Sequence, residues 1–192
     1  EQPRVLERII RTRLNGNLEA SLFDILPFAK AELRRVERIL IQACGTSWHA
    51  GLAGKFFLEG IAGLPTEVDV SSEFRYRHLI PQPLALVLSI TQSGETIDTL
   101  MGLRRGKERK FRALSICNVM GSTIARESDG VIYTHAGPEI GVASTKAYTA
   151  QLTILFLLSL YWGRVRGSVT RSRFKQLVRE LRALPEKMQQ IL

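Results

Sequence analysis

Hydroxyl, amide and glycine residues collect in four short loops of this sequence, and each loop directly follows a predicted strand. The loops are Cys44–Ser47, Thr91–Thr96, Asn118–Thr123 and Ala136–Ser144. In open α/β sheets, ligands bind beyond the carboxyl ends of the strands. The sequence therefore predicts one binding site, built jointly by these loops from mostly neutral hydrogen-bonding groups.

The loop at residues 91–96 is the most informative, because it joins the clearest strand to the start of a helix. Four of its six residues have a side chain that can donate a hydrogen bond: Thr91, Gln92, Ser93 and Thr96. Free backbone N–H groups and the helix dipole favour an anion at a helix start, and Gly94 lets the backbone approach a ligand closely. This pattern predicts a phosphate cradle without Lys or Arg. The alternative, that Ser93 only caps the helix, explains one hydroxyl and not four donors.

Neither of the two common nucleotide-binding loops occurs. The sequence contains no GxxxxGK(S/T) motif and no GxGxxG after its first strand. Bound ATP or a dinucleotide is therefore disfavoured, and no cofactor is expected. A small phosphorylated polyol suits hydroxyl-rich loops better.

The net charge of +9 comes mainly from the C-terminal end of the chain. Residues 164–192 hold eight basic and two acidic side chains and so contribute +6. A basic tail is one mark of nucleic-acid binding, but no interleaved aromatic pattern and no recognisable nucleic-acid-binding motif accompany it. The sequence therefore favours a solvated helix face and no nucleic-acid partner.

Cysteine usage and hydropathy exclude other classes. Two cysteines and three histidines without metal-ligand spacing predict no metal and a reduced, cytoplasmic protein. The longest uncharged stretch, Ala147–Gly163, has 17 residues with several polar side chains, whereas a membrane span needs about 20 apolar residues. We therefore expect a buried helix there and no membrane partner. No signal peptide opens the chain.

Apolar runs without helical period alternate with helical patterns along most of the chain. Predicted strands are 39–44, 66–70, 84–90, 112–117 and 130–134. Predicted helices are 4–14, 20–36, 47–62, 95–107, 122–127, 144–162 and 171–192, with breaks before Pro27 and near Pro185. Strands that are apolar on both faces need helices above and below, which predicts an α/β fold: a three-layer, doubly wound sheet of about five mainly parallel strands. We expect N-terminal helices at 1–38, the domain at 39–163 and a C-terminal helix at 164–192.

Four stretches of the sequence, in order and at matching spacing, resemble the sugar isomerase (SIS) domain. They are Cys44–Ser47, Ser72–Tyr76, Thr91–Thr99 and Glu139–Ala147. More narrowly, they resemble the first of two SIS domains in the glutamine–fructose-6-phosphate aminotransferase (glucosamine-6-phosphate synthase) family, over nearly the whole chain. Thr91 stands where that family usually has Ser, which keeps the hydroxyl, and Trp48 stands where Tyr is common.

The resemblance implies the conversion of fructose 6-phosphate and glutamine to glucosamine 6-phosphate and glutamate. It implies that the phosphate is held by Thr91, Gln92, Ser93 and Thr96. The implied sugar contacts are Thr46, Ser47, Val142 through its backbone, and Ala143 and Ser144 beside it.

The family's catalytic groups have no counterpart in these 192 residues. Its glutaminase uses an N-terminal cysteine, whereas this chain begins with Glu1, and its proton-shuttling Glu, ring-opening His and Schiff-base Lys lie in the second SIS domain. The resemblance implies a fragment of a larger enzyme, inactive alone, with no catalytic residue of its own. Its expected partners are the glutaminase and second SIS domain of the parent chain. We also expect a homodimer, because the 144–162 helix is apolar nearly all round.

Two other functions stay open. A non-catalytic phosphosugar sensor would normally carry a helix-turn-helix, which the first two helices do not resemble. A stand-alone phosphosugar isomerase would need its own acid/base pair, and no convincing pair is present.

Five chemically attractive side chains have simpler explanations. Cys44 ends a buried strand without a His or Asp partner and is interpreted as a small core residue. Glu95 should favour the helix dipole and point away from a phosphate. Lys146 is expected on a helix surface or interface, and Glu139 should shape its glycine-flanked loop. His49 is explained as well by packing as by ligand contact.

Overall fold

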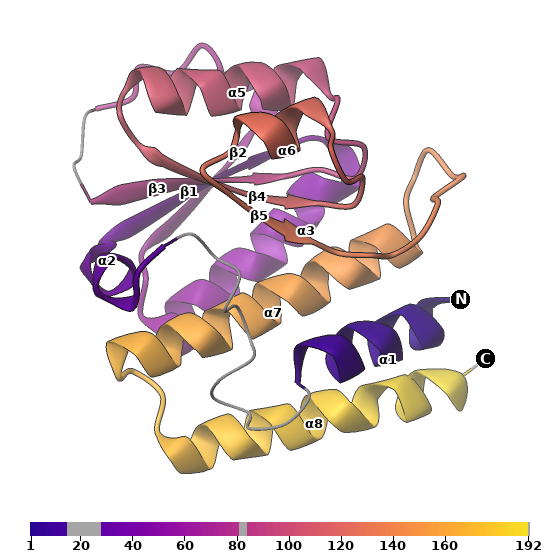
Figure 1. Cartoon of the computed structure of the whole chain (residues 1–192). Coiled ribbons are helices and arrows are strands. Elements are labelled where there is room, and N and C mark those ends of the chain that lie inside the picture. Colours follow the sequence, from indigo (N-terminus) through magenta and orange to yellow (C-terminus); the bar gives the residue numbers. More distant parts are fainter. Residues whose placement is uncertain (15–27, 81–83, 192) are drawn as a thin grey trace.

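The computed structural model of this chain describes residues 1–14, 28–80 and 84–191. Its centre is a parallel five-stranded sheet with strand order β2-β1-β3-β4-β5 (Figure 1). The strands are β1 Arg38–Ala43, β2 Thr66–Val70, β3 Ala85–Ile90, β4 Arg112–Cys117 and β5 Gly130–Tyr133. The predicted doubly wound α/β fold is confirmed, and each strand begins and ends within one residue of its predicted position.

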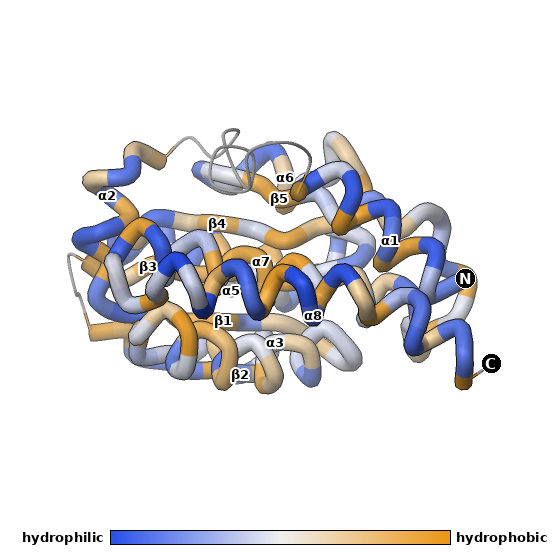
Figure 2. Tube along the Cα trace, turned by 90° about the horizontal axis from the view of Figure 1, so that it is seen from below, coloured by the Kyte–Doolittle hydropathy of each residue, from blue (hydrophilic) through white to orange (hydrophobic). Residues whose placement is uncertain are grey.

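Helices cover both faces of the sheet (Figure 1). One face carries α4 Ser71–Phe74, α5 Ile97–Glu108 and α6 Thr123–Glu127. The other carries α3 Gly45–Phe57, its π-helical continuation η1 Leu58–Ala62, and α7 Lys146–Arg166. The short α2 Lys30–Arg35 precedes β1, and α1 Gln2–Arg13 and α8 Arg171–Gln189 form a further layer on α7. Hydrophobic and hydrophilic positions alternate along α8 (Figure 2), as expected for a helix with one buried face.

Helix α7 forms the centre of the core on its side of the sheet. Its side chains are largely buried, and it packs against α3, η1 and α1. Trp162 is fully buried, and its indole N–H donates to the Leu33 carbonyl oxygen at 2.9 Å. The expected buried helix is confirmed. Because other parts of the chain largely cover this helix, its apolar surface is not evidence for a homodimer.

Several helix boundaries differ from the sequence predictions. Within the described residues, the predicted 20–36 helix is found only as Lys30–Arg35, and its earlier part, with the Pro27 break, lies outside them. The predicted stop at residues 15–17 also lies outside. Helix α4 was missed, since four residues are too few to show a hydrophobic period. Helix α7 continues to Arg166 and ends at Gly167, which has a left-handed φ of 77°.

The C-terminal helix runs through Pro185 without the predicted break. A proline in a helix removes one backbone hydrogen bond. The buried residues that dock α8 all precede the proline, from Phe174 to Leu181, so the helix is already fixed where the loss occurs. In the described part of the chain, no helix has the length and hydropathy needed to cross a bilayer.

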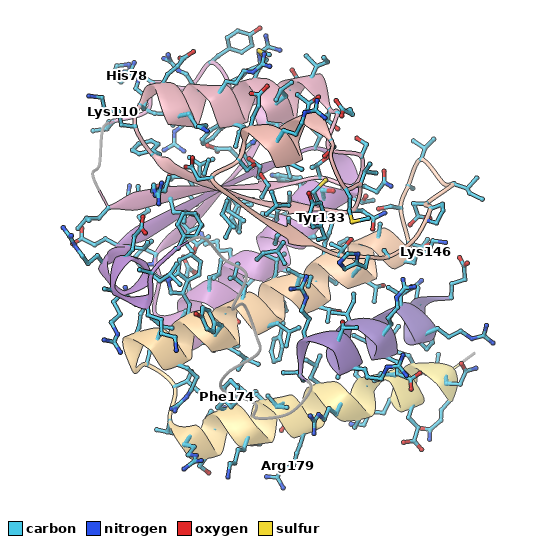
Figure 3. The ribbon with its side chains drawn as sticks, viewed as in Figure 1. His78, Lys110, Tyr133, Lys146, Phe174 and Arg179 are labelled. Carbon is cyan, nitrogen blue, oxygen red and sulfur yellow. The ribbon has the colours of Figure 1, made fainter. Side chains whose placement is uncertain are left out.

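The docking of α8 can be tested at Phe174, which is only 1% exposed and faces α7, whereas Arg179 points outward from the same helix (Figure 3). Phe174→Ala should lower the free energy of unfolding by about 3–5 kcal/mol, because it leaves a cavity between packed helices. Arg179→Ala should change it by less than about 0.5 kcal/mol. Chemical denaturation of both variants checks this, and equal losses would contradict the described packing.

Candidate functional site

A pocket of about 220 Å³ opens at the carboxyl ends of β1 and β3. The chain leaves β1 toward β2 on one side and continues from β3 toward β4 on the other, so this is the topological switch point of the sheet. Eight of the nine predicted site residues line the pocket: Thr46, Ser47, Thr91, Gln92, Ser93, Thr96, Val142 and Ser144. Ala143 is not among the lining residues. The lining also includes Cys44, Thr99, Glu139 and Gly141.

The loop after β4 does not contribute to this pocket, contrary to the four-loop prediction. Its Asn118 turns toward the loop after β5 instead. The Asn118 amide nitrogen donates to the Gly137 carbonyl oxygen at 2.8 Å, and its side-chain oxygen accepts from Thr134 and from the Ala136 N–H. The loop after β4 therefore supports a pocket-forming loop rather than forming the pocket itself.

Three hydroxyl groups of the pocket already accept a hydrogen bond from a nitrogen. The Gly94 N–H donates to Thr91 Oγ1 at 3.1 Å, the Glu95 N–H to Ser93 Oγ at 3.2 Å, and Gln151 Nε2 to Ser47 Oγ at 2.9 Å. A hydroxyl that accepts in this way still has its own hydrogen to donate. The pocket can therefore offer several O–H donors, and none of the described residues that line it is Lys, Arg or His. Such a lining suits an oxyanion.

Helix α5 begins beside this cluster of hydroxyls. Thr96 is its N-cap residue, and the Thr96 side chain makes no capping hydrogen bond. The alternative in which Ser93 caps the helix is therefore wrong, because the helix starts two residues later than predicted. Ser93 closes a local turn instead. Both Thr96 and Thr99 line the pocket, so the first turn of α5 directs its free N–H groups toward it.

Packing requires a glycine at position 94, for a reason separate from the predicted close approach to a ligand. Its φ is 71°, and a Cβ atom placed there would lie 2.0 Å from Ser122 Oγ and 2.9 Å from Cys117 Sγ. Its carbonyl oxygen accepts from the Ile124 N–H at 3.0 Å. The glycine therefore allows the 91–96 loop to pack against the β4–α6 connection. This packing fixes the position of the loop.

Glu95 and Glu139, two carboxylates near the pocket, are both engaged by backbone N–H groups. Glu95 accepts from the Thr123 N–H at 2.8 Å and does not line the pocket, so it points away as predicted. Glu139 does line the pocket, and its Oε2 accepts from the N–H groups of Thr145 and Ala147, each at 3.0 Å. Glu139 thus shapes the loop before α7, also as predicted.

Two predicted sugar-contacting loops meet directly. The hydroxyl groups of Thr46 and Ser144 lie 2.7 Å apart and hydrogen-bond to each other. Beyond this bond the 137–145 loop projects from the body of the domain (Figure 1), with Ile140 and Val142 fully exposed. The two loops therefore form one wall of the pocket.

Three other side chains that could do chemistry are Lys146, His49 and Cys44. The first two do not line the pocket, and the third is not the core residue that was predicted. Lys146 lies beside the N-terminus (Figure 3), where its Nζ is 2.9 Å from Glu1 Oε2. The His49 ring hydrogen-bonds through Nδ1 to the Gly45 carbonyl oxygen at 3.0 Å. Neither residue lines the pocket, whereas Cys44, interpreted as a core residue, is only partly buried and does. In residues 1–14, 28–80 and 84–191, no group of three or more His, Cys, Asp or Glu residues is placed to hold a metal.

Sequence comparison identifies the family. Residues 32–160 match the SIS domain family. This chain belongs to the SIS domain family. Two of the lining residues that the sequence prediction missed, Cys44 and Glu139, lie inside the loops that carry the resemblance, and Thr99 lies one helical turn after Thr96. That spacing was the available signal for Thr99.

Curated relatives place this SIS domain more narrowly. The chain is 50% identical to glutamine–fructose-6-phosphate aminotransferase (isomerizing) of Pseudomonas syringae pv. tomato and 48% identical to that of Thermus thermophilus. Both matches cover 100% of this chain and 31% of the relative. The chain therefore spans about a third of the length of these relatives.

Solved structures agree with the SIS assignment. The C-terminal domain of glucosamine-fructose-6-phosphate aminotransferase from Francisella tularensis superimposes with a TM-score of 0.90 at 39% identity, over 97% of this chain and 52% of that one. A putative phosphosugar isomerase from Clostridium difficile 630 gives 0.84 at 18% identity, over 99% and 51%. The second match shows the shared fold alone.

The contact between Glu95 and Thr123 predicts a pH dependence. The pKa of the Glu95 carboxyl is lowered because Thr123 donates hydrogen bonds to its charged form. A group of this kind stabilises the fold above its unfolded-state pKa, and the stabilisation is lost as pH falls through the folded-state pKa. Glu95→Gln should therefore lower stability at neutral pH, and the deficit should shrink in acid.

Urea denaturation at several pH values measures this difference. Glu186→Gln, which removes an exposed carboxylate on α8, is the control for loss of charge alone. A Glu95→Gln deficit that stays constant from neutral pH into acid would contradict the stabilising contact between the ionised Glu95 carboxylate and the Thr123 N–H.

Proposed function

We propose that this SIS domain binds a six-carbon sugar phosphate, fructose 6-phosphate or glucosamine 6-phosphate, as part of an isomerizing aminotransferase. The observation that carries the proposal is the set of pocket hydroxyls that accept N–H groups and keep their own hydrogens to donate. A phosphate has several strong acceptor oxygens and no need of a cation when enough donors converge. The relatives named as this aminotransferase support the choice of sugar.

Within the pocket, we assign the phosphate to the side chains that follow β3. These are Thr91, Gln92, Ser93 and Thr96, together with the first N–H groups of α5. The sugar hydroxyls are assigned to Thr46, Ser47 and Ser144, with Val142 contributing its backbone and Ala143 lying beside it. The Thr46–Ser144 hydrogen bond supports this division, because it holds the sugar-facing loops together across from the phosphate loop.

The chemical steps are assigned to residues outside this chain. Moving a proton between neighbouring sugar carbons requires a positioned acid or base. The only carboxylate among the described lining residues is Glu139, whose Oε2 already accepts from the N–H groups of Thr145 and Ala147 at the start of α7. Since the chain matches 31% of the relatives' length, we propose that a glutaminase domain and a second SIS domain of the parent protein supply ammonia and proton transfer. On this proposal residues 39–163 are the binding unit and residues 1–192 alone are inactive. A cytoplasmic homodimer stays a prediction from the sequence, because the covered α7 gives the dimer no further support.

Calorimetric titration tests the proposal. Fructose 6-phosphate should bind, and fructose should bind much more weakly, because the phosphate makes the charge-assisted hydrogen bonds. Ser93→Ala and Thr96→Ala should each weaken binding of the phosphate by about 1.5–3 kcal/mol, since each removes a donor to a charged acceptor.

The matched control is Ser168→Ala, which removes an exposed hydroxyl that donates to the Ile61 carbonyl oxygen, remote from the pocket. Its affinity for fructose 6-phosphate should equal that of the unmodified protein. Equal binding of fructose and its 6-phosphate, or unchanged affinity in both Ser93→Ala and Thr96→Ala, would refute the phosphate assignment.

A further inference from the structure

The segment Ser71–Tyr76 includes α4 and lies outside the pocket, although Ser72–Tyr76 is part of the SIS resemblance. Helix α4 follows β2 at the edge of the sheet and packs against α5 on the same face. It contacts the first turn of α5 by two independent routes, one buried and one charged. Because that turn borders the proposed phosphate, the segment can act on the site without touching the ligand.

The buried route runs through Gln42, a polar residue that follows the apolar residues Ile39–Ile41 of strand β1. Gln42 is 0% exposed. Its Nε2 donates to Ser89 Oγ at 2.7 Å and to the Thr99 carbonyl oxygen at 2.9 Å, and its Oε1 accepts from the Ser71 hydroxyl. Ser71 Oγ also lies 3.1 Å from Thr99 Oγ1. The first residue of α4 is thus connected to a pocket-lining residue of α5 through fully buried groups.

This network fixes the distance between α5 and the sheet. A Cβ atom added at Gly102 would lie 2.7 Å from Gln42 Oε1, so the helix rests directly on the amide. Buried hydrogen bonds in a low dielectric resist displacement, because any unpaired member bears its full desolvation penalty. The distance between the first turn of α5 and the sheet therefore depends on Ser71 and Gln42.

The charged route is an ion pair. Arg75 Nη1 lies 2.7 Å from Asp98 Oδ1, with the two side chains 27% and 39% exposed. Asp98 is the second residue of α5, so its negative charge lies within one turn of the N–H groups assigned to the phosphate. Without Arg75, that charge would oppose the binding of an anion.

We propose that Ser71 and Arg75 are positioning residues, through which α4 braces the first turn of α5 and cancels the charge of Asp98 beside the sugar phosphate. The inference rests on the proposed phosphate site and extends it to residues that do not touch the ligand. It also gives the Ser72–Tyr76 motif a role that the pocket geometry alone leaves open.

A double-mutant cycle at Arg75 and Asp98, with fructose 6-phosphate as the titrant, tests the charged route. Arg75→Gln should weaken binding about 3- to 10-fold at low salt, and the loss should shrink as added salt screens the exposed charge. Asp98→Asn should bind at least as tightly as the unmodified protein, and the double variant should recover most of the lost affinity. A loss that is independent of salt and is not recovered in the double variant would overturn the charge argument.

A matched pair of serine variants tests the buried route. Ser71→Ala and Ser159→Ala each remove a hydroxyl that is 0% exposed, but Ser159 bonds within α7 to the Phe156 carbonyl oxygen. At a temperature where both variants remain folded, only Ser71→Ala should lose affinity for fructose 6-phosphate, by about 3-fold or more. Equal affinities in the two variants would overturn the brace while leaving the phosphate site intact. Failure of the unmodified protein to prefer fructose 6-phosphate over fructose would refute the phosphate site itself, and the brace with it.

Discussion

The pocket exists because the chain leaves β1 and β3 toward opposite sides of one parallel sheet. The loops that follow these two strands diverge, and the space between them cannot be filled by either connection. Every other feature of the site depends on this arrangement. Helix α5 enters the space by its positive end, α7 supplies Gln151 beneath Ser47, and the loop before α7 closes over one side. The sheet thus brings together residues that are up to about a hundred positions apart in the sequence.

The hydrogen-bond donors that line the pocket are neutral, and the most basic part of the chain does not line it. The net positive charge concentrates in the last 29 positions, where six of the eight basic residues lie on α8. Helix α8 lies in the outer layer on α7 and lines no part of the pocket. Lys146, the cation nearest to the site in sequence, is paired with Glu1. On the proposed function, specificity for a sugar phosphate rests on the positions of hydroxyls and N–H groups, which are fixed by the turns at Gly94 and Thr96. A site of this kind selects by geometry more than by charge.

The strands and most of the pocket residues could be predicted from the sequence, because both signals are local. An apolar run such as Leu86–Ile90 has no helical period, and a following cluster of hydroxyls and glycine marks its carboxyl end. What could not be predicted depends on contacts distant in sequence. These contacts can be recognised only when the sheet order is known. They are the packing of Gly94 against Ser122, the hydrogen bond from Asn118 to Gly137, and the packing of α5 against Gln42. The short α4 could not be predicted for the same reason, because contacts with residues distant in sequence stabilise it and its own four residues do not.

We propose that the hydroxyl-rich loop after β3 binds the phosphate group. A crystal structure with fructose 6-phosphate tests this assignment most directly. We expect phosphate oxygens about 3 Å from the hydroxyls of Ser93 and Thr96, with the sugar extending toward Thr46 and Ser144. A phosphate bound instead to the basic surface of α8, with the pocket at β1 and β3 free of ligand, would contradict it.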